Sequence, residues 1–438
     1  MLRFAPSPTG FLHVGNARIA LLNYLYAKSK NIKFILRIDD TDKERSETKY
    51  VDAIKSDLSW LGIKYDDLFF QSNRMKNYFL ACELLKNKGK LYACYETPEE
   101  LGLKRKIQMK TGKPPIYDRS SLHLSNQEIK NFESEGRKPH WRLFLDETTI
   151  EWDDYIHKKI RFEKLSISDP ILIRSDNTPL FTLTSVIDDI DYKISNILRG
   201  DDHITNTAAQ IKLFQYLDAD IPNFGHFPLM MGSKGETMSK RLNSFSLGDI
   251  RNKKINPDVL NTLLANIGTS FNFEEIKNIE ILKEEFNLSN FSRNSIHFNF
   301  DDLHRLNNKY IKGMSFNQIK NLVNENFSEE FWEAIKLNIE SLEDISFWLD
   351  IVYKKKTEIN INEKYRDVIK IARLNLPKEI NSDTWSVWTK MISKLSGKKG
   401  KEIFLPLRFL LTGLKSGPEM NLIIPLFDRE EILRRLNV

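Results

Sequence analysis

Two short segments, far apart in the chain, carry residue types suited to holding phosphate groups. The first, His13-Val-Gly-Asn16, follows a strand candidate and opens a helix candidate, so free backbone N–H groups and the positive end of a helix dipole face any anion nearby. The Pro- and Gly-rich stretch Pro6-Ser-Pro-Thr-Gly10 comes just before it. The second, Thr237-Met-Ser-Lys-Arg241, offers a lysine that can reach the same phosphates from the other side.

Neither segment is specific by itself. A histidine near a helix start is common, and Met238-Ser-Lys-Arg241 is also typical of a solvated basic turn. Together they predict a nucleotide site in which Gly15 lets the ligand approach the backbone and His13 and Asn16 donate hydrogen bonds to phosphate. Lys240 would then neutralise the charge that grows as pyrophosphate leaves.

The elements that must position these residues alternate between strand and helix. Residues 2–4 and the apolar run 33–38 are typical of buried strands, and two stripes at helical spacing separate and follow them, the second stopped by Gly62. This order predicts a parallel sheet with helices on its faces. Further strands of that sheet are expected at 171–173, 193–198 and 227–231, after an irregular stretch that begins near residue 91.

The C-terminal part is predicted to be helical. Ile335, Ile339, Leu342 and Leu349 are spaced as on one long amphipathic helix, and a further helix around residues 405–410 should stop near Gly413.

Composition narrows the class of protein. The 438 residues should form about three or four domains at roughly 100 to 200 residues each. No apolar run approaches the ~20 residues of a membrane span and no signal peptide precedes the first strand, so a cytoplasmic location is expected. The net charge of +6 permits polyanion binding without requiring it. Two cysteines, Cys82 and Cys94, cannot build a four-cysteine zinc site, and we predict no structural metal.

The motifs together resemble a known family. The phosphate-binding segments are similar to the HIGH and KMSKS signatures of class I aminoacyl-tRNA synthetases, and the longer motifs resemble those of bacterial glutamyl-tRNA synthetases. The motifs are Arg3-Phe-Ala-Pro-Ser-Pro-Thr-Gly10, Leu12-His-Val-Gly-Asn-Ala-Arg18, Phe34-Ile-Leu-Arg-Ile-Asp-Asp-Thr-Asp42, Ile187-Asp-Asp189, Ile197-Leu-Arg-Gly-Asp-Asp-His203, Asn206-Thr207, Tyr92-Ala-Cys-Tyr-Glu-Thr-Pro-Glu99, Leu306-Asn-Asn-Lys-Tyr310, Phe404-Leu-Pro-Leu-Arg408, Leu411-Thr-Gly413 and Gly417-Pro418.

The resemblance implies a fold and a reaction. The expected fold is an α/β Rossmann-like catalytic domain (1–90 and 170–235), split by an acceptor-stem-binding insertion (91–169). A mainly helical stem-contact domain with the KMSKS-like loop (236–314) and an all-α anticodon-binding domain (315–438) should follow. The expected enzyme is a glutamate–tRNA ligase, which forms glutamyl-adenylate from glutamate and ATP with Mg²⁺. It then esterifies the 3′-terminal adenosine of tRNA(Glu), with tRNA(Gln) as a second candidate, and should be a monomer.

The resemblance also implies roles for individual residues. Catalysis is assigned to His13, Asn16 and Lys240, and ATP binding to Pro8, Thr9, Gly10, His13, Gly15, Asn16, Met238, Ser239 and Lys240. Glutamate binding is assigned to Arg3, Ala5, Ser7, Asp39, Phe181, Ser185 and Arg199, with the two arginines facing the side-chain carboxylate and Asp39 the ammonium group.

Some positions depart from the family pattern. Asp39 stands where Glu is more frequent, Phe181 and Ser185 where Tyr and Asn are common, and Thr237 where a first lysine is usual, for which Lys234 is a candidate substitute. These departures keep open a tRNA-binding paralogue without activation activity. Two enzymes of the same class are further alternatives: a glutaminyl-tRNA synthetase, which shares the catalytic signatures, and the short paralogue that glutamylates a modified nucleoside of tRNA.

Overall fold

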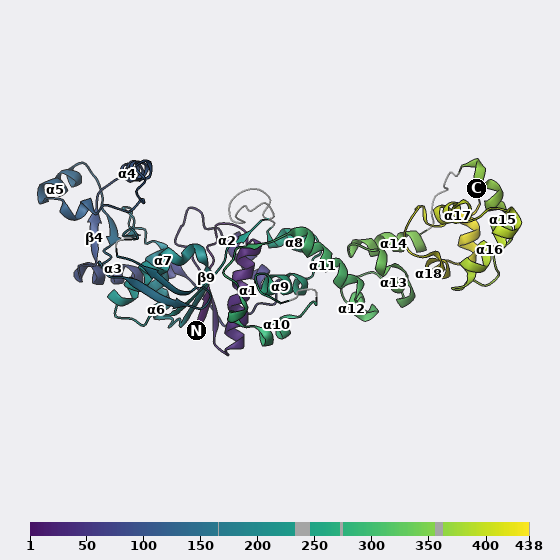
Figure 1. The fold of residues 1–438 in the computed structure, drawn as a ribbon, viewed down its shortest axis with the longest axis horizontal. Helices are drawn as coiled ribbons and strands as arrows, with labels where there is room; N and C mark the ends of the chain where they lie inside the picture. The colour runs from purple at the N-terminus through teal and green to yellow at the C-terminus, as the bar shows by residue number, and fades with distance from the viewer. Residues whose placement is uncertain (165, 233–245, 272–274, 355–361, 438) are drawn as a thin grey trace. The chain divides into compact units, whose positions relative to one another are not determined.

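The computed structural model describes residues 1–164, 166–232, 246–271, 275–354 and 362–437. The chain divides into two compact units, Met1–Phe300 and Asp301–Val438 (Figure 1). Each unit has a hydrophobic core of its own.

The first unit combines strands and helices. Its strands are β1 Leu2–Phe4, β2 Phe34–Ile38, β3 Asp67–Phe70, β4 Leu91–Cys94, β5 His140–Leu143, β6 Ile150–Asp154, β7 Lys158–Phe162, β8 Ile171–Ile173, β9 Asn196–Gly200, β10 Asn223–Phe227, β11 Met230–Met231 and β12 Ile296–His297. Its helices are α1 Val14–Ser29, α2 Thr48–Trp60, α3 Met75–Asn87, α4 Pro98–Lys110, α5 Asn126–Ser134, α6 Phe181–Asp191, α7 Ile204–Tyr216, α8 Leu247–Asn252, α9 Pro257–Asn266 and α10 Ile279–Glu285.

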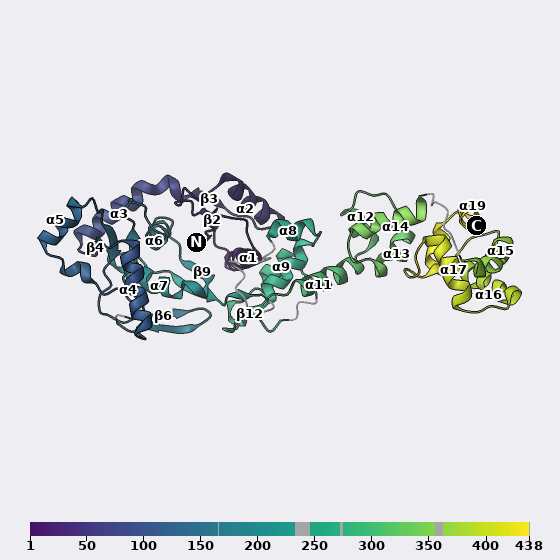
Figure 2. The same cartoon turned by 90° about the horizontal axis from the view of Figure 1, so that it is seen from above.

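A seven-stranded sheet in the order β3-β2-β1-β9-β10-β6-β7 organises this unit. Its neighbouring strands run parallel except for β6 and β7. Helix α1 lies on one side of the sheet and α6 and α7 on the other (Figure 2). The strand order reverses between β1 and β9, and ligands of open α/β sheets bind in the crevice at such a reversal, beyond the carboxyl ends of the strands.

The parallel sheet was predicted, but two of the segments assigned to it, 171–173 and 227–231, were placed wrongly. The parallel sheet takes residues 223–227 as β10, whereas β11 pairs with β12 in a separate two-stranded sheet. Strand β8 pairs with β5 in a separate antiparallel sheet, β4-β5-β8, and not with the parallel one. The hairpin β6–β7, whose residues fall within the range 91–169, joins the large sheet through the pairing of Asp154 with Phe224. A short apolar run shows that a strand is buried, but it carries no information about which neighbour the strand pairs with.

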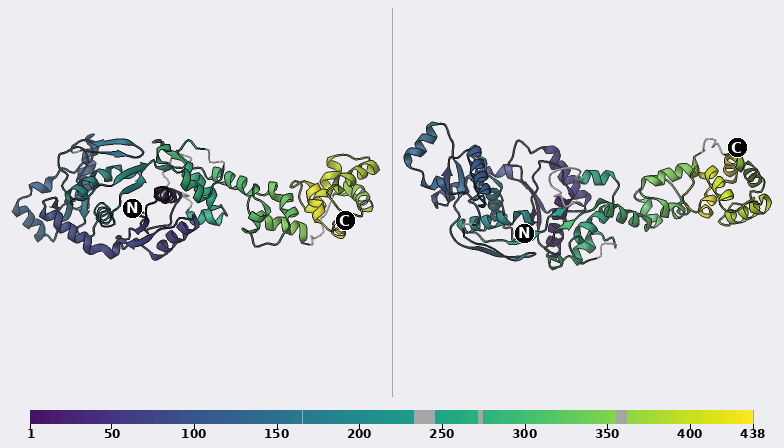
Figure 3. Two further views of the ribbon diagram at one scale, coloured as in Figure 1. Left: turned by 90° about the horizontal axis from the view of Figure 1, so that it is seen from below. Right: turned by 45° about the horizontal axis from the view of Figure 1, so that its top comes forward.

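The described residues of the second unit form helices joined by loops, with no strand among them (Figure 3). Its helices are α11 Phe300–Lys312, α12 Phe316–Lys320, α13 Glu329–Ile335, α14 Glu343–Tyr353, α15 Arg366–Leu374, α16 Thr384–Ser396, α17 Lys401–Thr412, α18 Met420–Ile423 and α19 Arg429–Arg435. The fully buried rings of Trp332 and Trp388 centre the core, and each indole N–H donates to a backbone carbonyl, at 3.0 Å to Met314 and 2.9 Å to Ala372.

Helix ends in this unit follow local capping chemistry. The predicted stop at Gly413 is confirmed, since this residue ends α17 with φ 75°. The single long helix through Ile335 and Leu349 was wrong, because α13 ends at Ile335 and α14 begins at Glu343. The Asp344 carboxylate accepts from the backbone N–H groups of Glu340 and Ser341 at 2.7 and 3.0 Å, which holds the turn that separates the two helices.

None of the helices that the described residues form has both the length and the apolar character needed to cross a membrane.

Candidate active site

A cavity of about 740 Å³ opens at the carboxyl ends of β1, β2 and β9, where the strand order reverses. The loop between β1 and α1, the first turns of α1 and the start of α6 complete its wall. Of the residues with predicted roles, it is lined by Arg3, Ala5, Ser7, Thr9, Gly10, His13, Gly15, Asn16, Asp39, Phe181 and Arg199. The cavity therefore brings residues from strands distant in sequence to one place.

His13 begins helix α1 and caps it. Its Nδ1 accepts the backbone N–H of Gly15 at 3.1 Å, and Asn16 Oδ1 lies 3.4 Å from the backbone N of His13. Burial lowers the pKa of His13, so the ring is neutral near pH 7. Since Nδ1 acts as an acceptor, the proton of the neutral ring is assigned to Nε2, which can donate to a ligand.

Gly15 is required by this capping geometry. A Cβ atom at position 15 would lie 2.9 Å from Cε1 and 3.0 Å from Nδ1 of the His13 ring, closer than carbon atoms tolerate. The predicted reason for this glycine was close approach of a nucleotide to the backbone. The structure adds another, which is that the glycine leaves room for the imidazole over the first turn.

The KMSKS-like segment falls on residues 233–245, so Lys234, Thr237, Met238, Ser239 and Lys240 lie outside the described residues. The chain on either side of them reaches the cavity. Met230 lines it, and Ser246 forms a β-bridge with His13 while the backbone N–H of Leu247 donates to Leu12 O at 2.9 Å.

Arg3 and Asp39 line the cavity, and each forms an ion pair with another residue of the chain. Arg3 donates from Nε and Nη2 to both carboxylate oxygens of Asp189, at 3.0 and 3.1 Å. Asp39 accepts from Arg37 at 2.6 and 3.1 Å, and Arg37 Nη1 also bonds Asp189 at 3.1 Å. Burial raises the pKa of Asp39 to about 6, which Arg37 partly opposes. The carboxylate is therefore largely ionised at pH 7, with much of its charge balanced by its partner.

Arg199 differs from these two arginines in its partners. Its Nη2 donates to Thr207 Oγ1 and, at 2.6 Å, to Gln210 Oε1, while its Nε lies 3.4 Å from Nε2 of His226. No carboxylate of the described residues lies within ion-pair distance, and Nη1 is buried with no hydrogen-bond partner among them. Burial and the nearby Arg3 lower the pKa of Arg199 to about 9, so it keeps its positive charge at neutral pH.

Two predicted residues stand behind the cavity wall. Ser185 is fully buried on α6, where its Oγ donates to the backbone oxygen of Phe181 at 2.6 Å and accepts from Gln210 Nε2 at 2.7 Å. Pro8 is buried, and its backbone oxygen accepts from Glu47 N at 3.1 Å. Ser185 therefore acts in this geometry on the residue that holds Arg199.

Sequence reasoning gave no role to several residues that fix these groups, namely Arg37, Asp154, Asp189, Thr207, Gln210 and His226. For Arg37 and His226 a usable signal was present, because each is a polar residue within an otherwise apolar strand, and buried polar groups need partners. That signal does not say which partner each residue takes.

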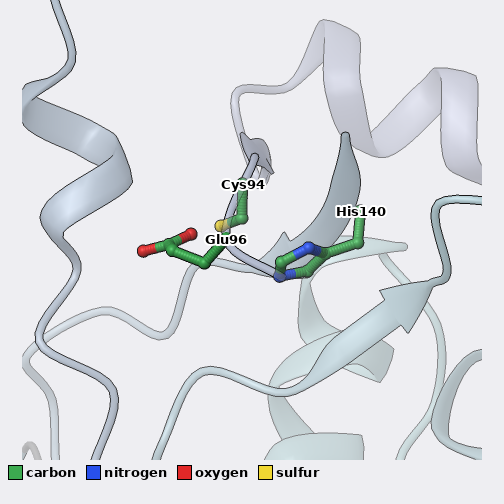
Figure 4. Close-up of side chains that lie close together, drawn as sticks. All are labelled: Cys94, Glu96 and His140. Carbon is green, nitrogen blue, oxygen red and sulfur yellow. The ribbon is translucent and has the colours of Figure 1, made fainter. Parts of the chain in front are cut away.

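A second cluster lies in the three-stranded sheet, where Cys94, Glu96 and His140 place ligand atoms within 4.8 Å of one another (Figure 4). The Glu96 oxygens already accept from Tyr117 at 2.6 Å, Ser121 at 2.8 Å and Ser120 at 2.9 Å. Burial alone would raise the pKa of Glu96, but these hydroxyl donors outweigh it and bring the pKa to about 2. The carboxylate is thus satisfied without an ion, and the absence of a structural metal stays a prediction.

Two family models match the chain. The catalytic-domain model of class I tRNA synthetases for glutamate and glutamine (E and Q) matches residues 1–305, and an anticodon binding domain model matches residues 302–438. "Glutamate–tRNA ligase 1" of Rickettsia prowazekii is 46% identical over 442 residues, which cover 99% of this chain and 98% of that protein. The protein of the same name in Maricaulis maris is 44% identical with the same coverage. The chain belongs to the glutamate–tRNA ligase family.

Solved structures agree on the fold. A glutamate tRNA ligase of Elizabethkingia meningosepticum, crystallised in complex with its amino acid, superposes with a TM-score of 0.82 over 99% of this chain and 98% of that one, at 22% identity. The class I catalytic domain followed by an anticodon-binding domain is therefore confirmed. As a family member the chain is an aminoacyl-tRNA ligase, and the glutamate assignment is supported over the alternatives considered from sequence.

Proposed function

We propose that this cavity activates L-glutamate with ATP and transfers the glutamyl group to tRNA(Glu). In the first step the α-carboxylate of glutamate attacks the α-phosphorus of ATP, which enters as its magnesium complex, and pyrophosphate leaves. In the second step a ribose hydroxyl of the 3′-terminal adenosine attacks the glutamyl carbonyl, and AMP leaves. Both steps need the phosphates held still and the amino acid oriented by its charged ends.

The observation that supports this proposal most strongly is that Arg199 is buried without a carboxylate partner among the described residues. A buried guanidinium without a carboxylate partner is costly, and a nitrogen with no acceptor adds to that cost. A ligand carboxylate at the cavity wall would balance the charge of Arg199 and accept a hydrogen bond from its Nη1. Glutamine has nearly the same shape, but its amide brings no charge, so the site would favour glutamate through electrostatics.

The phosphate end of the cavity is the first turn of α1. The positive end of the helix dipole and the assigned Nε2–H of His13 both favour an anion there. We assign His13 and Asn16, with Lys240 from the undescribed segment, to stabilising charge on the phosphates during adenylate formation. The Thr9 and Gly10 loop and Gly15 would border the nucleotide.

The amino-acid end combines the remaining assignments. Asp39 would attract the ammonium group, Arg199 would bind the side-chain carboxylate with Arg3 beside it, and Ala5, Ser7 and Phe181 would shape the pocket. Ser185 is assigned an indirect part through Gln210.

The parts beyond the cavity are assigned to tRNA. We propose that 91–169 bind the acceptor end, that 236–314 contact the stem and that 315–438 bind the anticodon, with the chain acting as a monomer in the cytoplasm. Use of tRNA(Gln) as a second substrate stays a prediction, because it depends on side chains of the anticodon domain that meet single bases.

Pyrophosphate exchange with ATP, glutamate and purified tRNA(Glu) tests the proposal. Arg199→Gln should lower kcat/KM for glutamate by ~100-fold or more and leave the KM for ATP near the wild-type value, since a buried charged partner is lost at one end of the site only. Arg161→Gln removes the same charge from an exposed position on β7, outside the cavity, and should leave the glutamate KM unchanged when tRNA(Glu) is saturating. Exchange supported equally well by glutamine would contradict the glutamate assignment.

A further inference from the structure

A buried acid–imidazole pair lies behind Arg199, where strands β6 and β10 meet. His226 Nδ1 and Asp154 Oδ2 are 2.5 Å apart, and both side chains are completely buried. The other carboxylate oxygen, Oδ1, accepts the backbone N–H groups of Ile156, His157 and His226 at 2.9, 3.0 and 3.2 Å. These bonds fix the orientation of the carboxylate and, through it, of the imidazole.

The protonation of the pair follows from its surroundings. Burial lowers the pKa of His226, and hydrogen bonds from His226 and the backbone outweigh burial to lower the pKa of Asp154. Near neutral pH the pair is therefore an ionised carboxylate and a neutral imidazole. A carboxylate only accepts hydrogen bonds, so the imidazole proton lies on Nδ1 and Nε2 presents a lone pair.

Thr207 and Arg199 both lie within hydrogen-bond distance of that lone pair. Nε2 of His226 lies 2.7 Å from Thr207 Oγ1 and 3.4 Å from Arg199 Nε, a group that can only donate. Thr207 Oγ1 and Gln210 Oε1 accept from Nη2 of the same guanidinium. Three neutral acceptors thus hold Nε and Nη2 in place, which leaves Nη1 for another partner.

We infer that His226 and Asp154 are positioning residues for amino-acid recognition, which aim Arg199 at the substrate carboxylate without neutralising it. This inference rests on the glutamate-binding role proposed for Arg199. A carboxylate in direct contact with Arg199 would hold it equally well but would compete with the ligand, as Asp189 does for Arg3. Asp154 instead acts through the neutral imidazole of His226, so the Arg199 guanidinium is held in place and keeps its positive charge.

Two substitutions of one residue separate this role from simple packing. In His226→Gln the side-chain amide reaches the place of Nε2 and can still accept from Arg199, whereas in His226→Asn it stops at the place of Nδ1. We expect the Asn variant to raise the glutamate KM about 10- to 100-fold, the range typical of lost outer-shell partners, with the ATP KM within about 3-fold of wild type. The Gln variant should stay within about 3-fold of wild type in both constants. Equal glutamate KM values for the two variants would overturn the inference.

Asp154→Asn gives a second, independent test. Only the amide oxygen of Asn can accept the three backbone N–H groups, so its NH₂ would face Nδ1 and force the imidazole proton onto Nε2. That nitrogen could then accept neither from Arg199 nor from the Thr207 hydroxyl. The glutamate KM should rise about 10-fold or more without a matching change for ATP. The ratio of the two KM values is independent of the fraction of folded enzyme, so lower stability does not mask the result.

The outcomes also distinguish this inference from the proposed function. If Arg199→Gln raises the glutamate KM but His226→Asn and Asp154→Asn do not, the positioning role is wrong and the glutamate site stands. If Arg199→Gln itself leaves the glutamate KM unchanged, the site assignment fails first.

Discussion

Gly15→Ala should reduce catalysis while leaving the fold as stable as before. A methyl group at position 15 would lie 2.9 and 3.0 Å from two ring atoms of His13, where ordinary contacts begin near 3.4 Å. Since the clash lies within the first turn of α1, the imidazole must swing away from its cap position. The hydrogen bond from the backbone N–H of Gly15 to Nδ1, now 3.1 Å, would then be lost.

The two effects on stability have opposite signs and similar size. Losing the capping bond costs about 0.5–1.5 kcal/mol, and alanine in place of glycine within a helix gains up to about 1 kcal/mol. By contrast, the displaced imidazole can only slow the activation step. A misplacement of about 1 Å at a catalytic donor can slow a reaction ~100-fold, which corresponds to ~2.7 kcal/mol in the barrier.

The assay pairs the rate of glutamyl-adenylate formation at saturating ATP with thermal unfolding. We expect the rate to fall ~100-fold and the Tm to move by only a few degrees. Gly102→Ala on α4 makes the same substitution where no atom lies within 4 Å of the new methyl group, and it should change neither quantity by much. A wild-type rate in Gly15→Ala would refute the assignment of the His13 ring as a positioned donor.

Further predictions concern the same reaction. His13→Asn keeps a side-chain acceptor for the helix cap but removes the imidazole donor, so activation should slow by ~100-fold without loss of Tm. Lys240→Ala should slow activation by a similar factor. An unchanged rate at saturating ATP in either variant would contradict the role assigned to that residue. Because the pKa of Asp39 is about 6, its charge is lost as pH falls through that value, and the glutamate KM should rise there while Asp39→Asn shows a flat profile. Wild-type enzyme should reject glutamine at activation by on the order of 1000-fold, measured by competitive pyrophosphate exchange.

Local sequence signals predicted the elements that carry the site. The helical spacing after His13 appears as α1, the apolar run ending before Asp39 as β2, and the stop at Gly62 follows α2 with φ 74°. These features depend on periodicity and capping within some twenty residues. The grouping of the cavity residues also followed, because parallel strands end at a common edge.

The partners of the charged residues could not be predicted in the same way. Asp39 is held by Arg37, two residues away, while Arg3 and Arg37 share Asp189 from a helix more than 150 positions later. Which carboxylate an arginine takes depends on how α6 lies against β1 and β2, and sequence spacing contains no such information. The same limit hid the pairing of β8 with β5.

The packing of α6 explains why the charge available to a substrate is concentrated on Arg199. Ser185 and Asp189 are four residues apart and therefore lie on one face of the helix, which is buried. The Asp189 carboxylate pairs with Arg3 and Arg37. The Ser185 hydroxyl is neutral and accepts a hydrogen bond from Gln210, which in turn contacts Arg199. Asp189 therefore balances the charge of Arg3 and Arg37, whereas the neutral groups around Arg199 leave its charge unbalanced. If Arg199 binds the substrate carboxylate as proposed, discrimination between a carboxylate and an amide would depend on this arginine, which has no carboxylate partner on the helix. Ser185 would then act through Gln210 on the orientation of Arg199.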